Sequence, residues 1–534
     1  VNFQNGINSF FHQIGEPNDF SQPKEEEEED TFDEQNPMSF LEQKGITKLM
    51  IDEAMEGQIV NQCLILKQHA YQEKAFEQRT DFEFVYAPNL LQVPHTMFNE
   101  ASNLEVAIMP KAAEILAKFQ DSQQENEISD SSEDQHEEIR EDENVQAFEN
   151  ECFGAFTGTN LKHAHFPSLK IVGAYAFRGC RLQKINFPLL TEVGAYGFNM
   201  CRVRQLDLPR AETIGAYGFR DCPIFSLQLP SVKKICRYAF QSCRVSELRM
   251  PLLTFVGDCA FDECPIKYLA LPSLRHVGSY CFQRCQLKEL DLPNLRTADD
   301  SSFFGAQLQT LNLPNLRRVG SWGFKQCPIQ SLNLPLLKII GDSGFGGCPI
   351  QSLNLPKLRK VGDGCFVGCK IRNLDLPSLE AADGGAFYKC PLESCNLQNL
   401  REAGESCFME CAELVDFAAP KLQEVGENCF SLCRKLKSVS CDVGAEFICQ
   451  FEKCLKVKGC IVCRGEKEVC LKRGKQKMFR DLLEGVRERQ GKLLQLMGDV
   501  LGVRAQNLKR IQNGFGSFGS ICGQIGQDMY LDVQ

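Results

Sequence analysis

The sequence predicts a repeat solenoid, in which short coils of chain stack and share one continuous parallel β-sheet. Three observations support this fold class. Prolines recur every 21 residues through the middle of the chain, a phenylalanine follows each proline by ten residues, and a cysteine usually follows three residues later. The 534 residues include 38 Phe but 10 Tyr and 1 Trp, which indicates one buried position repeated many times. Self-similarity at so short a period is typical of stacked repeats.

The repeating unit reads LxxLxLPxLxxVGxxxFxxC. Its prolines run in register from Pro167 to Pro377, and its phenylalanines from Phe177 to Phe387. The alternation in LxLP predicts a strand with one buried face, which ends at the proline because proline lacks an N–H. The glycine suits a turn with positive φ. So short a unit leaves no room for a helix, so we expect 3₁₀ turns or extended chain on the return side.

The repeats extend over residues 59–455 and leave four segments of other composition. Residues 1–38 form an acidic tail that we expect to be disordered, and a second acidic, disordered insert interrupts the array at about 121–146. We predict that residues 39–58 form an N-terminal helical cap. We predict that residues 456–534 form a Cys-rich, basic helical C-terminal cap or tail. This segment is a candidate for contact with an acidic partner or an anionic membrane surface.

The motif in residues 166–180, FPSLKIVGAYAFRGC, resembles the leucine-rich repeats of the BspA type. The resemblance covers roughly residues 60–455 and implies a right-handed leucine-rich-repeat coil. Family members with known roles act as adhesins or interaction proteins, so the resemblance also implies macromolecular binding. This chain departs from the family by its shorter unit, its regular cysteine and the lack of an evident surface anchor.

The outward residues of each strand, two and four positions before the proline, line one face and are the candidate ligand-binding site. This face is polar and of mixed charge, which disfavours nucleic acid because that partner needs a basic stripe. The alternative is a solvated face whose amides bond from rung to rung. The candidate residues are His163, His165, Lys184, Asn186, Gln205, Asp207, Gln228, Glu247, Arg249, Tyr268, Glu289, Asp291, Asn312, Asn333, Asn354 and Asp375.

A second candidate is a row of aromatic residues two positions before the phenylalanine. The same position becomes Gly364 and Gly385 further along, so we expect the row to be partly exposed. It could serve as a secondary binding patch, or the rings could stiffen the edge of the coil. The aromatic members are Tyr175, Tyr196, Tyr217, Tyr238, Tyr280 and Trp322.

Three further patterns carry weaker expectations. Basic residues recur three or four positions after the proline, as at Arg317 and Arg359, and form a charged stripe. The in-register cysteines predict a column of buried thiols. Cys460 and Cys463 have zinc-ligand spacing, but no second pair follows, so we predict no metal site. No nucleophile elbow, phosphate loop or metalloprotease helix is present, so we predict no catalytic residue and no cofactor.

The sequence therefore predicts a non-catalytic protein that binds a macromolecule, mainly protein, as an intracellular scaffold. A surface or secreted adhesin that binds host protein or glycan is the alternative. The expected free thiols and the absence of a visible signal peptide or membrane span favour the cytoplasm. The first residue is Val1, and an incomplete N-terminus would favour the cell surface or secretion.

Overall fold

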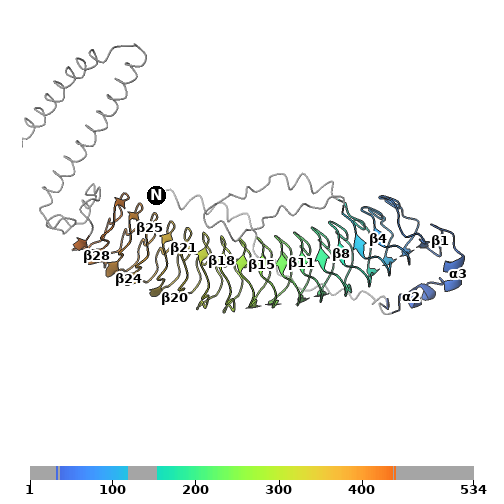
Figure 1. The fold of residues 1–534 in the computed structure, drawn as a ribbon, viewed down its shortest axis with the longest axis horizontal. Helices are drawn as coiled ribbons and strands as arrows, with labels where there is room; N and C mark the ends of the chain where they lie inside the picture. Colours follow the sequence, from blue (N-terminus) through green and yellow to red (C-terminus); the bar gives the residue numbers. More distant parts are fainter. Residues whose placement is uncertain (1–31, 34–35, 118–152, 437, 441–534) are drawn as a thin grey trace, which may run out of the picture.

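The computed structural model describes residues 32–33, 36–117, 153–436 and 438–440. This part of the chain forms a parallel β-solenoid of about 16 coils with little helix, which confirms the predicted repeat solenoid. The coils stack along the long axis of the molecule, and two short helices lie at its N-terminal end (Figure 1). The acidic tail, the acidic insert and the predicted C-terminal cap or tail, with Cys460 and Cys463, lie almost wholly outside the described residues.

The LxL part of the repeat forms a three-residue strand in most coils. In β10 the central residue, Leu206, points into the core, while Gln205 and Asp207 on either side are exposed. Equivalent residues of consecutive coils pair in parallel, for example Leu206 with Leu227. These strands are β2 (Cys63–Ile65), β3 (Phe84–Tyr86), β5 (Val106–Ile108), β7 (His163–His165), β10 (Gln205–Asp207), β12 (Ser226–Gln228), β14 (Glu247–Arg249), β16 (Tyr268–Ala270), β20 (Ser331–Asn333), β22 (Ser352–Asn354), β24 (Asn373–Asp375), β26 (Ser394–Asn396), β28 (Asp416–Ala418) and β30 (Ser438–Ser440).

The uninterrupted sheet lies on a different part of the coil from the one the sequence indicated. It has 15 strands of two residues each, which begin four residues after the proline, whereas the LxL strands pair in several shorter sheets. Its strands are β4 (Gln92–Val93), β6 (Glu114–Ile115), β8 (Ile171–Val172), β9 (Glu192–Val193), β11 (Thr213–Ile214), β13 (Lys234–Ile235), β15 (Phe255–Val256), β17 (His276–Val277), β18 (Thr297–Ala298), β19 (Arg318–Val319), β21 (Ile339–Ile340), β23 (Lys360–Val361), β25 (Ala381–Ala382), β27 (Glu402–Ala403) and β29 (Glu424–Val425).

The glycine that follows most of these two-residue strands allows the close stacking. A Cβ on Gly215 would lie 2.7 Å from both the carbonyl carbon of Gly194 and the carbonyl oxygen of Val193 in the preceding coil. Close approach, and not the expected positive φ, therefore requires glycine here. Positive φ occurs at Tyr217 (58°) and Asp221 (60°) instead. Because 3₁₀ helices need successive negative φ values, these residues make the return segment a series of turns.

The repeated phenylalanine forms a continuous column of rings through the core from Phe76 to Phe430. The centroids of successive rings lie between 5.0 and 6.0 Å apart. The acidic insert does not interrupt the column, because Phe156 stacks between Phe98 at 5.4 Å and Phe177 at 5.1 Å. The coil that leaves the described structure after residue 117 is therefore completed when the chain returns at residue 153.

The N-terminal helices are α2 (Pro37–Gln43) and α3 (Lys48–Glu53), and the strand β1 (Ile59–Val60) follows them. The side chain of Asn36 accepts a hydrogen bond from the Ser39 N–H, and Pro37 follows it directly, so the first turn of α2 is capped. Thr47 caps α3 in the same way through the Met50 N–H. Strand β1 pairs antiparallel with β2, so it reverses the chain direction at the first edge of the solenoid.

Candidate binding faces

The predicted ligand-binding residues all lie on the side of the solenoid formed by the LxL segments, which we call the outer strand face. Most are exposed, and those of β10, β14, β20 and β24 alternate with a buried central residue. The alternation persists around Lys184 and Asn186, where no strand is assigned, because Ile185 between them is buried. His163 and His165 are half-buried. The sequence pattern therefore placed these side chains on one face.

The first three coils, which contain β2, β3 and β5 and are called the N-terminal coils below, differ on this face. Their outward residues are apolar or aromatic, and all but Tyr86 are almost wholly buried, from 0% exposure at Ile65 to 4% at Phe84. Tyr86 is half-buried. They form a separate cluster with side chains of the N-terminal segment, on the opposite side of the strands from the main core. Its buried members are Phe40, Leu41, Ile46, Ile51, Ala54, Cys63, Ile65, Phe84, Val106 and Ile108.

Ring contacts show how far this covering extends. The Phe40 ring of α2 meets Phe84 edge-on, with centroids 5.5 Å apart, and the Lys44 ammonium lies 5.8 Å from the centroid of the same Phe84 ring. Phe32, at the start of the described chain, stacks on His163 of β7 at 4.7 Å. The N-terminal segment therefore crosses the outer strand face from the first coil to the fourth. This contact was not predicted, although the apolar outward pairs Cys63/Ile65 and Val106/Ile108 are a sequence signal for it.

Beyond β7 the outer strand face is polar and open, and its first half has basic and aromatic side chains. Phe225 and Tyr268 expose 52% and 40% of their surfaces. The Arg249 guanidinium lies 4.9 Å from the Tyr268 ring centroid, a cation–π distance, and 3.5 Å from the Glu247 carboxylate. Exposed aromatic and Arg side chains of this kind are enriched among residues that dominate binding energy. Sequence analysis did not identify Phe225.

In the second half of the face, polar side chains hydrogen-bond from one coil to the next, as in the alternative expectation of a solvated face. The Asn354 side-chain amide donates to the Asn333 side-chain oxygen at 2.8 Å, and Asn396 donates to Asp375 at 3.2 Å. The Ser394 hydroxyl donates to the Asn373 oxygen at 3.0 Å. These groups are already hydrogen-bonded to one another along the solenoid.

The row of tyrosines forms a stack that is less exposed than expected. The rings from Tyr175 to Tyr238 lie nearly parallel with centroids 4.4 to 4.7 Å apart. Tyr196 and Tyr217, inside the stack, are only 8% exposed, which corrects the expected exposure. Every residue of the row has positive φ, so the change to glycine at Gly364 and Gly385 reflects backbone conformation and not solvent contact. Tyr280 and Trp322, which stand apart from the stack, are exposed.

The in-register cysteines form the expected column of buried thiols. Most of these free thiols donate to the carbonyl of a buried phenylalanine one coil earlier, as Cys222 does to Phe198 at 3.1 Å and Cys201 to Phe177 at 3.0 Å. Cys285 donates instead to the Cys264 carbonyl at 3.6 Å. Burial raises the pKa of the Cys222 thiol to about 12. These thiols are therefore held in the protonated form that can donate to the carbonyl.

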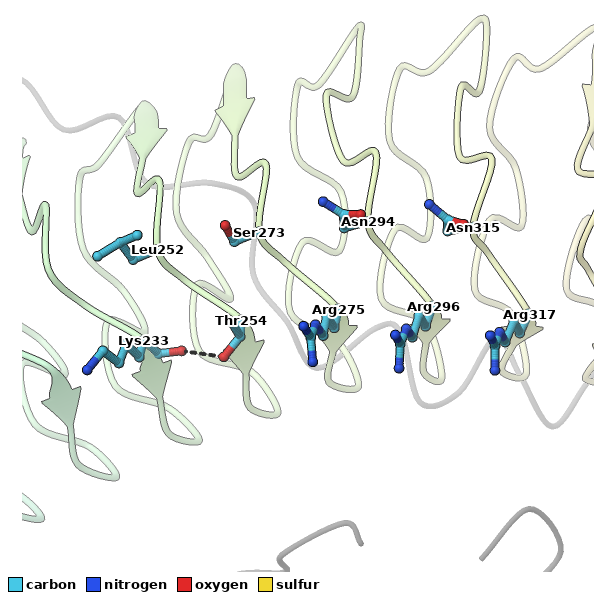
Figure 2. Close-up of a pocket in the computed structure, with 9 residues that line it drawn as sticks. All are labelled: Lys233, Leu252, Thr254, Ser273, Arg275, Asn294, Arg296, Asn315 and Arg317. Carbon is cyan, nitrogen blue, oxygen red and sulfur yellow. Dashed lines mark hydrogen bonds between the residues drawn. The ribbon is translucent and has the colours of Figure 1, made fainter. Parts of the chain in front are cut away.

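A shallow groove of about 480 Å³ lies beside the 15-stranded sheet, away from the outer strand face. One side carries Ser273, Asn294 and Asn315, whose side chains donate to the proline carbonyl of the preceding coil. The other side carries parallel arginines, of which Arg275 and Arg317 are two (Figure 2). The basic stripe is visible in the repeat, but the groove that it borders appears only in the folded chain.

Two kinds of feature are missing from the described residues, a membrane-spanning helix and a metal-binding cluster. No helix in them is long and apolar enough to cross a membrane. No group of three or more His, Cys, Asp or Glu side chains in that part of the chain is arranged to hold a metal ion.

The stacked coils and the LxL strands define a leucine-rich-repeat solenoid. A family model described as the BspA type leucine rich repeat region matches in six copies, over residues 146–222, 212–333 and 338–458. Because these ranges cover more than half of the sequence, the chain belongs to the BspA-type leucine-rich-repeat family. Such solenoids are typical binding scaffolds and not typical enzymes.

Solved structures of other leucine-rich-repeat proteins are similar to the chain. A leucine-rich repeat protein from Bacteroides ovatus is 24% identical, with 54% of this chain and 87% of that chain covered and a TM-score of 0.41. A leucine rich cell surface protein from Faecalibacterium prausnitzii is 14% identical, with 73% and 91% covered and a TM-score of 0.27. No curated protein matches the sequence.

Proposed function

We propose that the chain is a non-catalytic scaffold that binds a protein partner on the outer strand face, in the half between β7 and β16. One observation carries this proposal: the same face of the N-terminal coils already holds a polypeptide, the chain's own segment around α2 and α3. The solenoid can thus bury apolar side chains of another segment against its outward residues. Beyond β7 the exposed Phe225 and Tyr268 offer aromatic anchors for a separate partner.

The partner would bind to a surface that is already ordered. The strands beneath it are held by parallel pairs such as Glu247 with Tyr268, and by a buried core. A rigid surface loses little conformational entropy when a partner binds. The mixed charges around Arg249 and Glu247 would set the orientation of the partner, because charge complementarity contributes more to specificity than to affinity.

Photo-crosslinking tests the proposal in the cells that make the protein. A benzophenone amino acid would replace Phe225 or Tyr268 on the outer strand face, or Met200, which is 55% exposed on the turn side, as the matched control. We expect the same partner protein to crosslink at both face positions and not at residue 200. Crosslinking at residue 200 alone, or at none of the three positions, would contradict the proposal.

Within this proposal we place the scaffold inside the cell, and the alternative is a surface or secreted adhesin that binds host protein or glycan. The family to which the chain belongs supports the alternative, whereas the column of free thiols supports the intracellular scaffold. Intact cells labelled with a membrane-impermeable amine reagent distinguish them. A tagged chain beside an untagged cytosolic control would overturn the intracellular scaffold, and an untagged chain that is abundant in the lysate would exclude the adhesin.

A further inference from the structure

The groove beside the 15-stranded sheet carries a regular row of positive charge. The row's members lie three residues after the proline in five consecutive coils: Arg275, Arg296, Arg317, Lys338 and Arg359. The first three line the groove, and Lys338 and Arg359 continue the row in the next two coils. Backbone hydrogen bonds lock them in register, since the N–H of each residue donates to the carbonyl oxygen of the previous one at 2.8 Å. We call these five residues the basic row.

The positive charges of the basic row lie close enough to repel one another. Like charges directly opposite each other on adjacent strands repel, and strands lie roughly 4.8 Å apart. Carboxylates do lie beside the next position along the chain, where the Lys360 ammonium is 3.3 Å from the Asp383 carboxylate and the His276 ring is 3.3 Å from that of Asp299. Among the described residues, in contrast, no carboxylate lies within ion-pair distance of Arg275, Arg317 or Arg359. Repetition over five coils favours an extended anionic chain over a compact anion.

The side of the groove opposite the arginines is preorganised. The Ser273, Asn294 and Asn315 side chains are held by the carbonyls of Pro251, Pro272 and Pro293, at 2.6, 2.8 and 2.9 Å. The basic side chains project in parallel on the other side (Figure 2). An extended polypeptide lying along the solenoid axis would meet a new cation about every 5 Å, close to the rise of one to two residues.

We propose that this groove binds an extended acidic polypeptide, and that its occupant is the chain's own segment 121–144. That segment has eleven Asp or Glu residues and one Arg. The chain leaves the described structure at residue 117, just after β6, which belongs to the same 15-stranded sheet as the strands beside the basic row. The occupant is therefore tethered on the side of the solenoid that holds the groove.

The segment between residues 117 and 153 is long enough to reach the basic row and return to the solenoid. Six strand-to-strand steps lead from β6 to β17, beside Arg275, and ten lead to β23, beside Arg359. These steps correspond to roughly 30 and 50 Å at the usual strand spacing. Half of the 35 intervening residues spans roughly 55 Å when extended, so the segment can reach the basic row and return. A tether of this length keeps the acids at a high effective concentration.

Peptide binding to the full chain tests the proposal. A fluorescent synthetic peptide of residues 121–144 would be added to the natural chain and to a variant in which residues 118–152 are replaced by a Gly/Ser linker of equal length. We expect the linker variant to bind at least about tenfold more tightly, because its groove is empty, and its affinity to fall as salt is raised. Equal affinity for both proteins, or no binding to the linker variant, would overturn the proposal.

Charge reversal locates the site. In the linker variant, Arg275→Glu, Arg317→Glu and Arg359→Glu together should abolish peptide binding. Lys184→Glu, Arg204→Glu and Arg249→Glu on the outer strand face are the matched control and should leave it unchanged. The reverse pattern would place the peptide on the outer strand face and overturn the proposal. Circular dichroism of both triple variants checks that these surface changes leave the fold intact.

A third measurement examines the tethered segment in the chain itself. A Glu-specific protease should cut within residues 121–144 about tenfold faster when Arg275, Arg317 and Arg359 of the basic row are changed to Glu, because bound chain is protected. A single-stranded oligonucleotide of equal charge that displaced the peptide at lower concentration would identify nucleic acid as the occupant and overturn the proposal. The groove lies apart from the outer strand face, so its failure would leave the proposed scaffold function untouched.

Discussion

The N-terminal coils and the coils from β7 onward share one repeat and one core, yet their outer strand faces behave in opposite ways. Ile108 of β5 is 1% exposed beneath the N-terminal segment, whereas Asn312, in the same register, faces solvent. Both positions lie two residues before a proline and next to a buried central residue. The core residues therefore specify the shape of the coil. The outward residues specify whether its outer strand face is covered by the N-terminal segment or exposed to solvent.

The N-terminal coils and the later coils also differ at the position of the buried cysteine. The cysteine column begins at Cys180, while the equivalent positions of the second and third N-terminal coils are Ala101 and Thr159, which are also buried. In the later coils a thiol donates to the buried phenylalanine carbonyl, as Cys243 does to Phe219 at 3.3 Å. Two parts of one solenoid thus use different side chains at the same buried position.

The largest expected effect is unfolding of the later coils, those from β7 onward, at alkaline pH. Burial raises the pKa of Cys180, Cys222 and Cys390 from 9.0 to about 12, so the folded chain keeps protons that the unfolded chain loses. Stability is therefore full below about pH 9 and falls by about 1.4 kcal/mol per pH unit per thiol as pH rises toward 12.

Fluorescence of Trp322, the single tryptophan, reports on the later coils during such a titration. Pulse proteolysis with fragment mapping compares them with the N-terminal coils, where Cys63 is the buried thiol among the described residues. Later coils that unfold first would match the expectation. Unchanged fluorescence up to about pH 11, or earlier loss of the N-terminal coils, would contradict it.

An exchange of outward residues tests whether the covering depends on them. Ile108→Asn should destabilise the N-terminal coils by about 3 kcal/mol, because it removes buried apolar contact and leaves a polar group without a partner. Asn312→Ile, its matched control, should change stability by less than about 0.5 kcal/mol because the position is exposed. Urea unfolding measures both variants. Equal effects would show that the N-terminal segment does not bury this face.

The smallest expected effect concerns one thiol of the column. Cys222→Ala removes the donor to the Phe198 carbonyl and should lower the free energy of unfolding by about 1 kcal/mol. Cys222→Ser keeps a donor at the same place and should cost less. A Ser variant less stable than the Ala variant would mean that apolar packing, and not the hydrogen bond, selects cysteine here.

Much of the fold could be predicted from the period of the repeat. The spacing of proline, phenylalanine and cysteine identified the coils, the buried column and the outward residues, because each depends only on position within one unit. Other features could not be read in that way. The glycine after the two-residue strand was assigned to positive φ because sequence does not show that the backbone of the previous coil lies within 3 Å of where its Cβ would be.

The sequence by itself determined the solenoid, its register and the polarity of each outward position, since these follow from short-range periodicity. Only the tertiary structure decided which sheet runs unbroken, that Tyr196 and Tyr217 are buried by stacking, and that the N-terminal segment covers β2, β3 and β5. Those features depend on contacts between separate coils or between the solenoid and a distant segment. Such contacts arise from the packing of the whole stack, and no single repeat contains them.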